Sequence, residues 1–381
     1  MDSPQPRLHR LLELAGLFVK LGLTSFGGPV GHIALMENEA VHKRRWLSRE
    51  YFLDLLAATN LVPGPNATEM AIHIGYVRAG WPGLVVSGAA FILPAFFITL
   101  ALAWAYVEYG ALPQVGAILY GIKPVVVGIV AVAVYRLGKA ALTELKAGLL
   151  FVAVLILSFF RLNEVALLLA SGVAGVLLYT PPSLRPWMTA GMGLGFSLPS
   201  LSGVLPSRLL QIGLYFLKVG SLLFGSGLLL FAFVQHDVVE SYGWLTPQQL
   251  VDAIAAGQVT PGPVLSSATF IGYLLEGTPG AVVATIAVFL PSFLIVSLTG
   301  PWIPRLRDSK GAYAFLRGVT AGALALILGT GLLLARAAVV DIWTALLAIA
   351  SLGILWRTEL DVVWVIAGGA IIGWLRYWLG S

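Results

Sequence analysis

The chain has 381 residues, of which 58% are hydrophobic and 11% are charged, and its mean hydropathy is +0.90. So few polar side chains cannot cover that much apolar surface, which excludes a soluble globular protein. The formal net charge is +5, and no solvated basic domain is present that could bind nucleic acid. The absence of cysteine excludes disulfides, thiolate ligands and cysteine nucleophiles. The composition therefore predicts a polytopic membrane protein.

Apolar segments of spanning or near-spanning length follow one another along the chain. They cover residues 11–35, 53–77, 83–107, 112–135, 147–160, 163–180, 187–205, 209–234, 250–275, 279–300, 314–335, 340–355 and 360–380. Several contain Gly or Pro, so the number of segments need not equal the number of crossings. The first segment follows a short Arg-containing start without a small-residue cleavage site, and we expect it to remain as an uncleaved anchor.

The tripeptide Pro-Gly-Pro occurs twice inside these apolar segments, at residues 63–65 and 261–263. Proline lacks a backbone donor and glycine adds conformational freedom, so each copy is expected to break a helix at membrane depth. Broken helices are tolerated at that depth only where they line a cavity within the protein. The two breaks are therefore the predicted location of a substrate.

The chain aligns with itself at an offset of 198 residues, which becomes 197 after a one-residue deletion. The matched residues include both Pro-Gly-Pro copies, Phe18 with Phe216, Lys20 with Lys218, Phe26 with Phe224, Trp46 with Trp244, Asp54 with Asp252 and Gly75 with Gly272. This duplication predicts an N-terminal repeat at residues 1–180, a connecting segment at 181–208 and a C-terminal repeat at 209–381.

The distribution of Lys and Arg predicts the orientation of the repeats, because short cytoplasmic loops collect basic residues. The loop at 42–50 is strongly basic, whereas its counterpart at 235–249 contains no Lys or Arg. Most Lys and Arg residues fall on one side of the membrane if residues 51–79 and 250–275 each form a re-entrant hairpin of two half-helices. The first segment of each half, broken at residues 27–29 and 225–227, either forms another hairpin or crosses. Both versions predict an all-α polytopic membrane protein of two inverted-topology halves with broken or re-entrant helices, as in secondary transporters.

Lys20 and Lys218 are the first candidates for contact with a substrate. Each lies inside an apolar segment, six residues before a Phe-Gly break, where a charged side chain costs at least ~2.5 kcal/mol. Alternatively, each lysine reaches the membrane interface along its aliphatic stem. Lys123, whose counterpart is Thr320, is a further candidate for a buried cation.

A helix that begins after each Pro-Gly-Pro would direct free N–H groups and the positive end of its dipole towards the break. Helix starts near Pro29 and Gly227 would add to this effect. Cations and helix N-termini that converge on one cavity predict an anion as the ligand. Polar side chains that could donate hydrogen bonds to this anion, or alternatively serve in capping and packing, are Thr24, Ser25, Asn66, Thr68, Gln258, Ser266 and Ser267.

Glu69 and His73 lie one helical turn apart after the first break, and either could bind a coupling proton. The spacing from Asn66 to Glu69 also fits a capping box, in which Glu69 closes back onto the N-cap amide. Asp54 and Asp252 are either titrating groups, partners of a lysine or acidic residues at helix starts.

His32, whose counterpart is Leu230, is a further candidate for carrying a proton. The basic run at residues 43–45 is interpreted as a topology signal or a contact with lipid headgroups. No Walker motif, metal-ligand cluster or Gly-x-Ser-x-Gly turn is present, and no loop is long enough for a soluble catalytic domain. We therefore expect no enzyme activity, no cofactor and no metal site.

Four segments resemble the chromate ion transporter family, and in particular its long, two-domain members. They are FVKLGLTSFGGPVGHIALM from Phe18, LAATNLVPGPNATEMAIHIGY from Leu56, FLKVGSLLFGSG from Phe216 and AIAAGQVTPGPVLSSATFIGYLLEGTPGA from Ala253. The resemblance extends over nearly the whole chain. It implies a prokaryotic carrier of the cytoplasmic (inner) membrane that expels chromate with energy from the proton gradient, and so confers chromate resistance.

The resemblance also implies a set of site residues in each half. They are Phe26, Gly27, Gly28, Pro63, Gly64, Pro65 and Asn66 in the first half, and Phe224, Gly225, Pro261, Gly262 and Pro263 in the second. Ser226 replaces Gly28 and Val264 replaces Asn66 in the second copy. The two halves are therefore not expected to contribute equally.

Two alternatives keep the site but change the function. Sulfate is a dianionic tetrahedral oxyanion of similar shape, so the protein could transport sulfate or another small oxyanion. A passive anion channel, with the hairpins as its filter, is the other alternative. The expected partners are the oxyanion and membrane lipids, without nucleic acid. The expected oligomeric state is a monomer or homodimer, since the duplication allows one chain to form a complete pathway.

Overall fold

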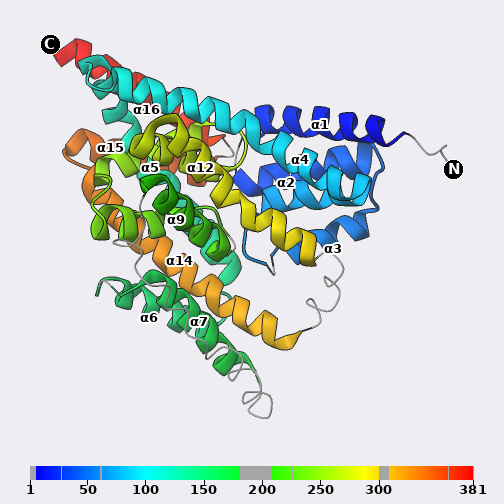
Figure 1. Cartoon of the computed structure of the whole chain (residues 1–381). Helices are drawn as coiled ribbons and strands as arrows, with labels where there is room; N and C mark the ends of the chain where they lie inside the picture. Colours follow the sequence, from blue (N-terminus) through cyan, green and yellow to red (C-terminus); the bar gives the residue numbers. More distant parts are fainter. Residues whose placement is uncertain are drawn as a thin grey trace. The chain divides into compact units, whose positions relative to one another are not determined.

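The computed structural model describes residues 6–26, 28–60, 62–160, 162–180, 207–224, 226–299, 309–358 and 360–380. These residues form helices and short connections, with no strand among them (Figure 1). The predicted all-α class is therefore confirmed. Two candidate site residues, Gly27 and Gly225, and most of the predicted connecting segment at 181–208 lie outside the described residues.

The helices of the two halves follow one another in the same order. The first half contains α1 (Arg7–Thr24), α2 (Gly28–Glu37), the π-helix η1 (Asn38–Lys43), α3 (Arg49–Thr59), α4 (Asn66–Tyr109), α5 (Pro113–Ala141), α6 (Leu145–Ser158) and α7 (Glu164–Tyr179). The second half contains α9 (Arg208–Leu222), α10 (Leu229–Phe233), the π-helix η3 (Val234–Ser241), α11 (Pro247–Val259), the 3₁₀ turn η4 (Val264–Ser266), α12 (Ser267–Thr299), α14 (Lys310–Ala338), α15 (Ile342–Arg357) and α16 (Val362–Gly380). The sequence duplication is therefore a duplication of structure.

Within the described residues, 5 helices are long and apolar enough to cross a membrane. They are Asn66–Tyr109, Pro113–Ala141, Val264–Leu298, Lys310–Ala338 and Val362–Leu379. Leu145–Ser158, Glu164–Tyr179 and Ile342–Arg357 are shorter apolar helices. The protein is thus a multi-pass membrane protein. The apolar segment expected at 187–205 lies outside the described residues.

Both long helices that follow a Pro-Gly-Pro bend at equivalent points. Ala79 and Gly80 interrupt α4, and Glu276 and Gly277 interrupt α12, 197 residues later. The two glycines have φ values of 68° and 58°, which a residue with a side chain adopts only at a cost. The bend therefore separates a short half-helix beside each Pro-Gly-Pro from a longer apolar helix. These short half-helices, together with α3 and α11, are the half-helices that the sequence predicts at 51–79 and 250–275.

The two π-helices were not predicted, because a wide turn leaves no clear signal in hydrophobic periodicity. They end in the same way in both repeats. The N–H of Trp46 donates to the carbonyl of Ala40, and the N–H of Trp244 donates to the carbonyl of Val238, each over 2.8 Å. The residue before each tryptophan has a positive φ, 51° at Arg45 and 62° at Gly243.

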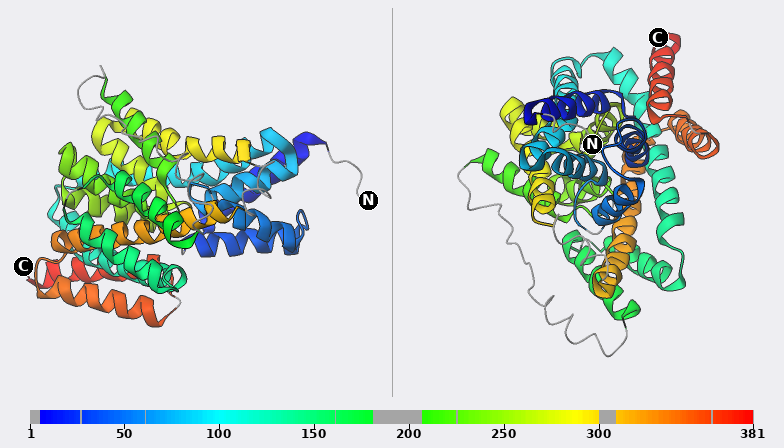
Figure 2. Two further views of the ribbon diagram at one scale, coloured as in Figure 1. Left: turned by 90° about the horizontal axis from the view of Figure 1, so that it is seen from below. Right: turned by 90° about the vertical axis from the view of Figure 1, so that its right-hand side faces the viewer.

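The described contacts divide the chain into two compact units, and each unit contains parts of both repeats. One unit consists of Met1–Glu108, Ile212–Gly227 and Ala256–Leu306, and it includes both Pro-Gly-Pro segments. The other consists of Tyr109–Gln211, Leu228–Ala255 and Arg307–Ser381. In this second unit α14 packs against α5, α6 and α7, and α5 also packs against α15 and α16. The helices α15 (orange) and α16 (red) lie side by side in Figure 2.

Small residues permit close helix packing in this second unit. A Cβ added to Gly175 would lie 2.8 Å from the backbone of Gly318, and one added to Gly369 would lie 2.7 Å from the carbonyl oxygen of Gly121. Such small-residue contacts bring helix backbones together where lipid gives no hydrophobic driving force for association.

The conformation of Gly262 leads to a stability prediction. This residue has a φ of 95°, and an added Cβ would lie 3.2 Å from the Cβ of Ala95 and 3.3 Å from the carbonyl oxygen of Gly22. We expect Gly262→Ala to destabilise the protein by roughly 1–3 kcal/mol, the usual cost of such backbone strain. Thermal unfolding of the purified protein measures the effect. Gly16→Ala is the control, since nothing lies within 4 Å of its added Cβ. Equal melting temperatures for the two variants would contradict this account.

Candidate functional site

Two reciprocal backbone hydrogen bonds join the repeats at their Pro-Gly-Pro tips. The N–H of Gly262 donates to the carbonyl of Ser25 over 3.0 Å, and the N–H of Gly64 donates to the carbonyl of Leu223 over 2.6 Å. Ser25 and Leu223 are equivalent positions, 198 residues apart, as are Gly64 and Gly262. Such an exchange of equivalent contacts is the pattern that two-fold symmetry produces. The break that follows α1 or α9 in one repeat therefore receives the tip of the other repeat.

The sequence Pro-Gly-Pro explains why a single donor stands at each tip. Neither proline has an N–H, so glycine is the only residue of the tripeptide that can donate a backbone hydrogen bond. Both glycines have positive φ, 155° at Gly64 and 95° at Gly262. A Cβ on Gly64 would lie 2.8 Å from the Oγ of Ser292 and would collide with the Glu69 carboxyl group. The glycines are thus required by both conformation and space.

The predicted helix starts around the breaks are confirmed. In the first repeat α4 begins at Asn66, directly after Pro65, and α2 begins at Gly28. In the second repeat the η4 turn and α12 follow Pro263, and α10 begins at Leu229. The first N–H groups of a helix have no partner within the helix, which makes these positions suitable for binding an anion.

Three hydroxyl side chains beside the breaks are buried without a hydrogen-bond partner. Ser25, Thr68 and Ser266 are at most 2% exposed, and none of their side-chain oxygens has a partner within the described residues. Buried hydroxyl groups in folded proteins are normally satisfied, so unsatisfied ones indicate a place for a polar ligand. Their role as hydrogen-bond donors to an anion stays a prediction.

Other predicted residues are occupied by local contacts or shape the tips. Thr24 donates to the carbonyl of Lys20 over 2.8 Å, Ser267 donates to the carbonyl of Val264 over 3.0 Å, and the side-chain amide of Asn66 donates to Asn60 over 2.6 Å. These contacts match the capping and packing alternative. The residues that flank the breaks are buried or half-buried: Phe26, Pro63, Pro65, Phe224, Pro261 and Pro263.

Lys20 has a carboxylate partner that the sequence reading missed. Its Nζ lies 3.1 Å from an oxygen of Glu39, which also accepts from Lys43 over 3.0 Å, and the Nε of Arg44 lies 3.4 Å from the other oxygen. Glu39 is 6% exposed, whereas the side chain of Lys20 is 58% exposed. The residue equivalent to Glu39 is Asp237. A search of the repeats for similar rather than identical residues could have found this duplicated acid.

The second candidate lysine, Lys218, lies in α9. Its Nζ is 5.1 Å from the ring centroid of Tyr215, a cation–π distance. Unlike Lys20, it is only partly exposed. The proposed contact of Lys20 and Lys218 with a shared anion remains a prediction.

Lys123 and Asp252 form a buried ion pair that joins the repeats within the second unit. The Nζ of Lys123, in α5, lies 3.2 Å from the Oδ2 of Asp252, in α11, and the two side chains are 20% and 2% exposed. One of the alternatives for Asp252, the partner of a lysine, is thus observed. The residue equivalent to Lys123 is the exposed Thr320, so this pair has no symmetric copy. Asp54, the counterpart of Asp252, is half-buried in α3.

Glu69 and His73 are buried in the half-helix that follows the first break, with exposures of 0% and 2%. Both carboxyl oxygens of Glu69 and the Nε2 of His73 have no hydrogen-bond partner in the described part of the chain. The capping-box interpretation of Glu69 is therefore wrong. The physical reason is that α4 begins at Asn66, which puts the N-cap position at Pro65, a residue without an N–H, and makes Glu69 the fourth helical residue, whereas a capping box needs the third.

His32 lies against the Ser25 carbonyl that receives the second tip. Its Nε2 is 3.0 Å from this oxygen, and its ring packs edge-on to Phe91 with a centroid distance of 5.7 Å. His32 is 2% exposed. Its counterpart is Leu230, so the contact between an imidazole and the break has no equivalent in the second repeat.

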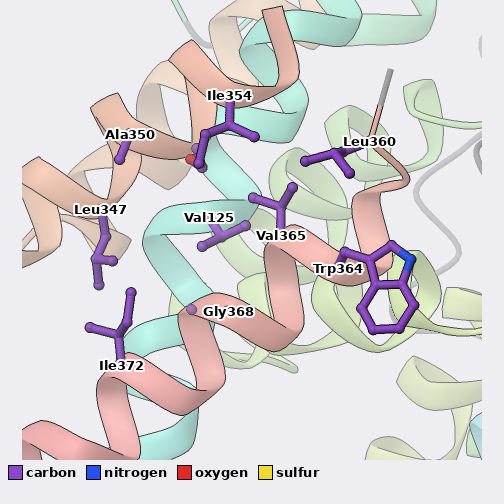
Figure 3. A pocket seen from close by; sticks show the side chains of 11 residues that line it. Val125, Leu347, Ala350, Ile354, Leu360, Trp364, Val365, Gly368 and Ile372 are labelled. Carbon is purple, nitrogen blue, oxygen red and sulfur yellow. The ribbon is translucent and has the colours of Figure 1, made fainter. Parts of the chain in front are cut away.

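A separate apolar pocket of about 170 Å³ lies between α5, α15 and α16 in the second unit (Figure 3). Val125, Leu347, Ile354 and Trp364 are among its lining residues, and no charged residue lines it. Its wall therefore offers a dianion no cation. It is therefore distinct from the predicted anion site.

The Glu39 cluster predicts how stability depends on pH. The hydrogen bond from Lys43 is the main cause that lowers the pKa of Glu39 from 4.5 to about 2, with burial opposing it and Lys20 adding to it. Because the folded state has the lower pKa, the stabilisation is complete above about pH 4.5 and is lost as the pH falls towards 2. Thermal unfolding of the wild type and of Glu39→Gln should therefore differ at neutral pH and converge on acidification. A constant difference down to pH 2 would exclude this role.

The Lys123–Asp252 pair leads to a second stability prediction. Removing one partner leaves a buried charge unpaired, and we expect Lys123→Met to cost about 3–5 kcal/mol. The double variant Lys123→Met, Asp252→Asn removes both charges, so it should be more stable than the single variant. Lys139→Met, on an exposed part of α5, is the control. Urea or thermal unfolding of the reconstituted variants checks the order, and additive effects of the two substitutions would show that the pair is not coupled.

Comparison with known proteins extends over the whole chain. The profile of a family described as "Chromate transporter" matches residues 12–176 and 210–374. A "Chromate transport protein" of Cupriavidus metallidurans is 37% identical, with 99% of each chain covered. A "Probable chromate transport protein" of Synechococcus elongatus is 34% identical, covering 92% of this chain and 91% of the relative. No solved structure matches the chain. With both repeats matched by the same profile, the chain belongs to the chromate transporter family.

Proposed function

We propose that this protein is a secondary active transporter that exports chromate across the cytoplasmic membrane and so confers chromate resistance. The observation that carries the proposal is the reciprocal exchange of single hydrogen bonds between the two Pro-Gly-Pro tips and the breaks of the opposite repeats. Unsatisfied hydroxyl groups surround these breaks. The names of the relatives support chromate as the substrate.

Chromate would bind by competing for the donors at the tips. Each tip glycine donates to a neutral carbonyl, and a dianionic oxygen is a stronger acceptor because the hydrogen bond is charge-assisted. The helix N-termini after the breaks, the hydroxyl groups of Ser25, Thr68 and Ser266, and Lys20 and Lys218 would supply further contacts. Release of the carbonyl of Ser25 or Leu223 would then free one repeat from the tip of the other. This gives substrate binding a direct route to alternating access.

The coupling proton is assigned to a carboxyl group or to His73. The candidates are Glu69, His73, Asp54 and Asp252. Glu69 fits this role best, because a fully buried carboxyl group without a partner is far less costly in its neutral, protonated form. Asp252 already has a cationic partner in Lys123. Proton entry through Glu69 would thus accompany chromate exit.

The organisation of the protein follows from the repeats. We assign residues 1–180 and 209–381 as the two transporter repeats and 181–208 as their connection. Both tips and both receiving breaks are present in one chain, so a monomer can form the whole pathway. A homodimer of two such pathways is equally compatible with the described contacts.

Uptake into inverted membrane vesicles tests the proposal. We expect chromate uptake to saturate, to show counterflow, and to resist competition by sulfate, molybdate and phosphate. Lys20→Ala and Lys218→Ala should each raise the KM for chromate roughly tenfold or more, the factor expected for the loss of a charge-assisted hydrogen bond. Wild-type kinetics in both variants would eliminate the two lysines from the site. Strong competition by sulfate would reassign the substrate, and non-saturating flux without counterflow would indicate a channel.

The dependence of transport on the proton gradient is measured separately. Collapsing the proton gradient with a protonophore should abolish concentrative uptake into the vesicles while leaving counterflow intact. Unchanged uptake after collapse would rule out proton coupling. Vesicles that lack the protein provide the background in each case.

A further inference from the structure

Ser292 in α12 lies beside the first Pro-Gly-Pro tip, although it belongs to the second repeat. Its Oγ is 2.8 Å from the position that a Cβ on Gly64 would occupy, and the Oε1 of Glu69 contacts the same position. Ser292 is 0% exposed, as is Glu69. The hydroxyl of one repeat and the carboxyl of the other therefore converge on the space left by the missing side chain of Gly64.

The Oγ of Ser292 and both carboxyl oxygens of Glu69 lack a hydrogen-bond partner within the described ranges. Leaving several buried polar atoms unsatisfied at one point is costly, and folded proteins rarely do so. A protonated carboxyl group has one O–H donor, and a serine hydroxyl can accept it. An O–H of Glu69 directed at the Oγ of Ser292 would give each group a hydrogen-bond partner.

We propose that Ser292 is the positioning residue that accepts a hydrogen bond from protonated Glu69 and so holds the coupling proton between the repeats. This inference rests on the proposed function in that Glu69 carries the proton. The proton is covalently bound to a Glu69 oxygen and is donated to the Oγ of Ser292. When the proton leaves, the hydroxyl of Ser292 can turn and donate to the carboxylate, so the contact between α4 and α12 persists with the direction of its hydrogen bond reversed.

The location of this bond connects it to the tips. Gly64, against which both groups lie, also donates its N–H to Leu223. The nearest titratable groups in sequence on the elements that meet here are His73 on α4, Lys218 on α9 and Glu276 on α12. The Glu69–Ser292 bond would therefore be a second link at a point where the repeats share a backbone hydrogen bond, and its direction would follow the protonation state of Glu69.

The second tip lacks this arrangement. The residue equivalent to Ser292 is Ala95, whose Cβ lies 3.2 Å from the corresponding position at Gly262. Serines occupy positions 266 and 267, where a carboxyl equivalent to Glu69 would stand. We therefore expect one proton site of this kind per chain, at the first tip.

Infrared difference spectroscopy of the purified protein in lipid tests the bond directly. We expect a C=O stretching band of protonated Glu69 that is absent in Glu69→Gln. Ser292→Ala should shift this band to higher wavenumber, because the carboxyl group loses its acceptor, whereas Ser292→Thr should leave it in place. Ser297→Ala is the matched control on the same helix, since Ser297 is half-buried and already donates to the carbonyl of Leu294.

Transport provides the second readout. Ser292→Ala should lower proton-driven chromate uptake roughly two- to tenfold, the range expected for one lost hydrogen bond, while Ser292→Thr retains it. If Ser292→Ala does not insert, Ser292→Cys keeps the volume with a weaker acceptor and should give a smaller shift of the band.

The outcomes separate the inference from the proposed function. An unshifted band in Ser292→Ala, with the band still lost in Glu69→Gln, would overturn the role of Ser292 and leave proton coupling through Glu69 intact. Full proton-driven uptake in Glu69→Gln would instead remove Glu69 from the coupling mechanism. A band that responds to sodium rather than to protons would also overturn the inference, because the oxygens would then be ligands of a metal cation.

Discussion

The structure depends on the need to satisfy backbone polar groups where a helix is broken inside a membrane. Lipid offers no hydrogen-bond partners, so each break must find them within the protein. Here the carbonyls of Ser25 and Leu223 and the amides of Gly64 and Gly262 satisfy one another across the repeats. Each repeat is incomplete without the other at this point, and the two-fold exchange follows from that need. The glycines, the flanking prolines and the bends at Gly80 and Gly277 all serve to bring these few groups into register.

Charge is distributed much less symmetrically than the backbone. Glu39 collects Lys20, Lys43 and Arg44 in the first repeat, whereas the loop of the second repeat contains no Lys or Arg. The Lys123–Asp252 pair occurs once, as do the imidazole of His32 and the carboxyl of Glu69. A symmetric scaffold thus supports two chemically different tips. This difference is one that the proposed binding of an anion and a proton at separate places would need.

Much of this organisation could be predicted from the sequence, because proline, glycine and intramembrane charge have strong local effects. The class, the duplication, the breaks and the helix starts after Pro65 and Pro263 follow from such residues. The partner of Lys20 was missed because identical residues alone were matched between the repeats, whereas Glu39 and Asp237 are similar and lie in unpredicted π-helices. Capping-box spacing at Asn66–Glu69 was misleading, because α4 begins one residue earlier than that spacing assumes, with Pro65 at the N-cap position. No motif in the sequence pointed to Ser292, because it is far from Gly64 along the chain and comes close to the first Pro-Gly-Pro tip only in the folded protein.

The two compact units have a consequence for how such a chain could arise. Each unit is assembled from both repeats, and α4, α9 and α11 each pass from one unit into the other along the chain. Neither repeat is therefore an independent folding domain, in spite of its complete set of helices. A polypeptide that contained only one repeat would have to find a second chain inserted in the opposite orientation before its tip had a partner. The ancestor of this protein is thus expected to be an antiparallel dimer, and the fusion of two copies fixed the stoichiometry and orientation that such a dimer had to reach by assembly.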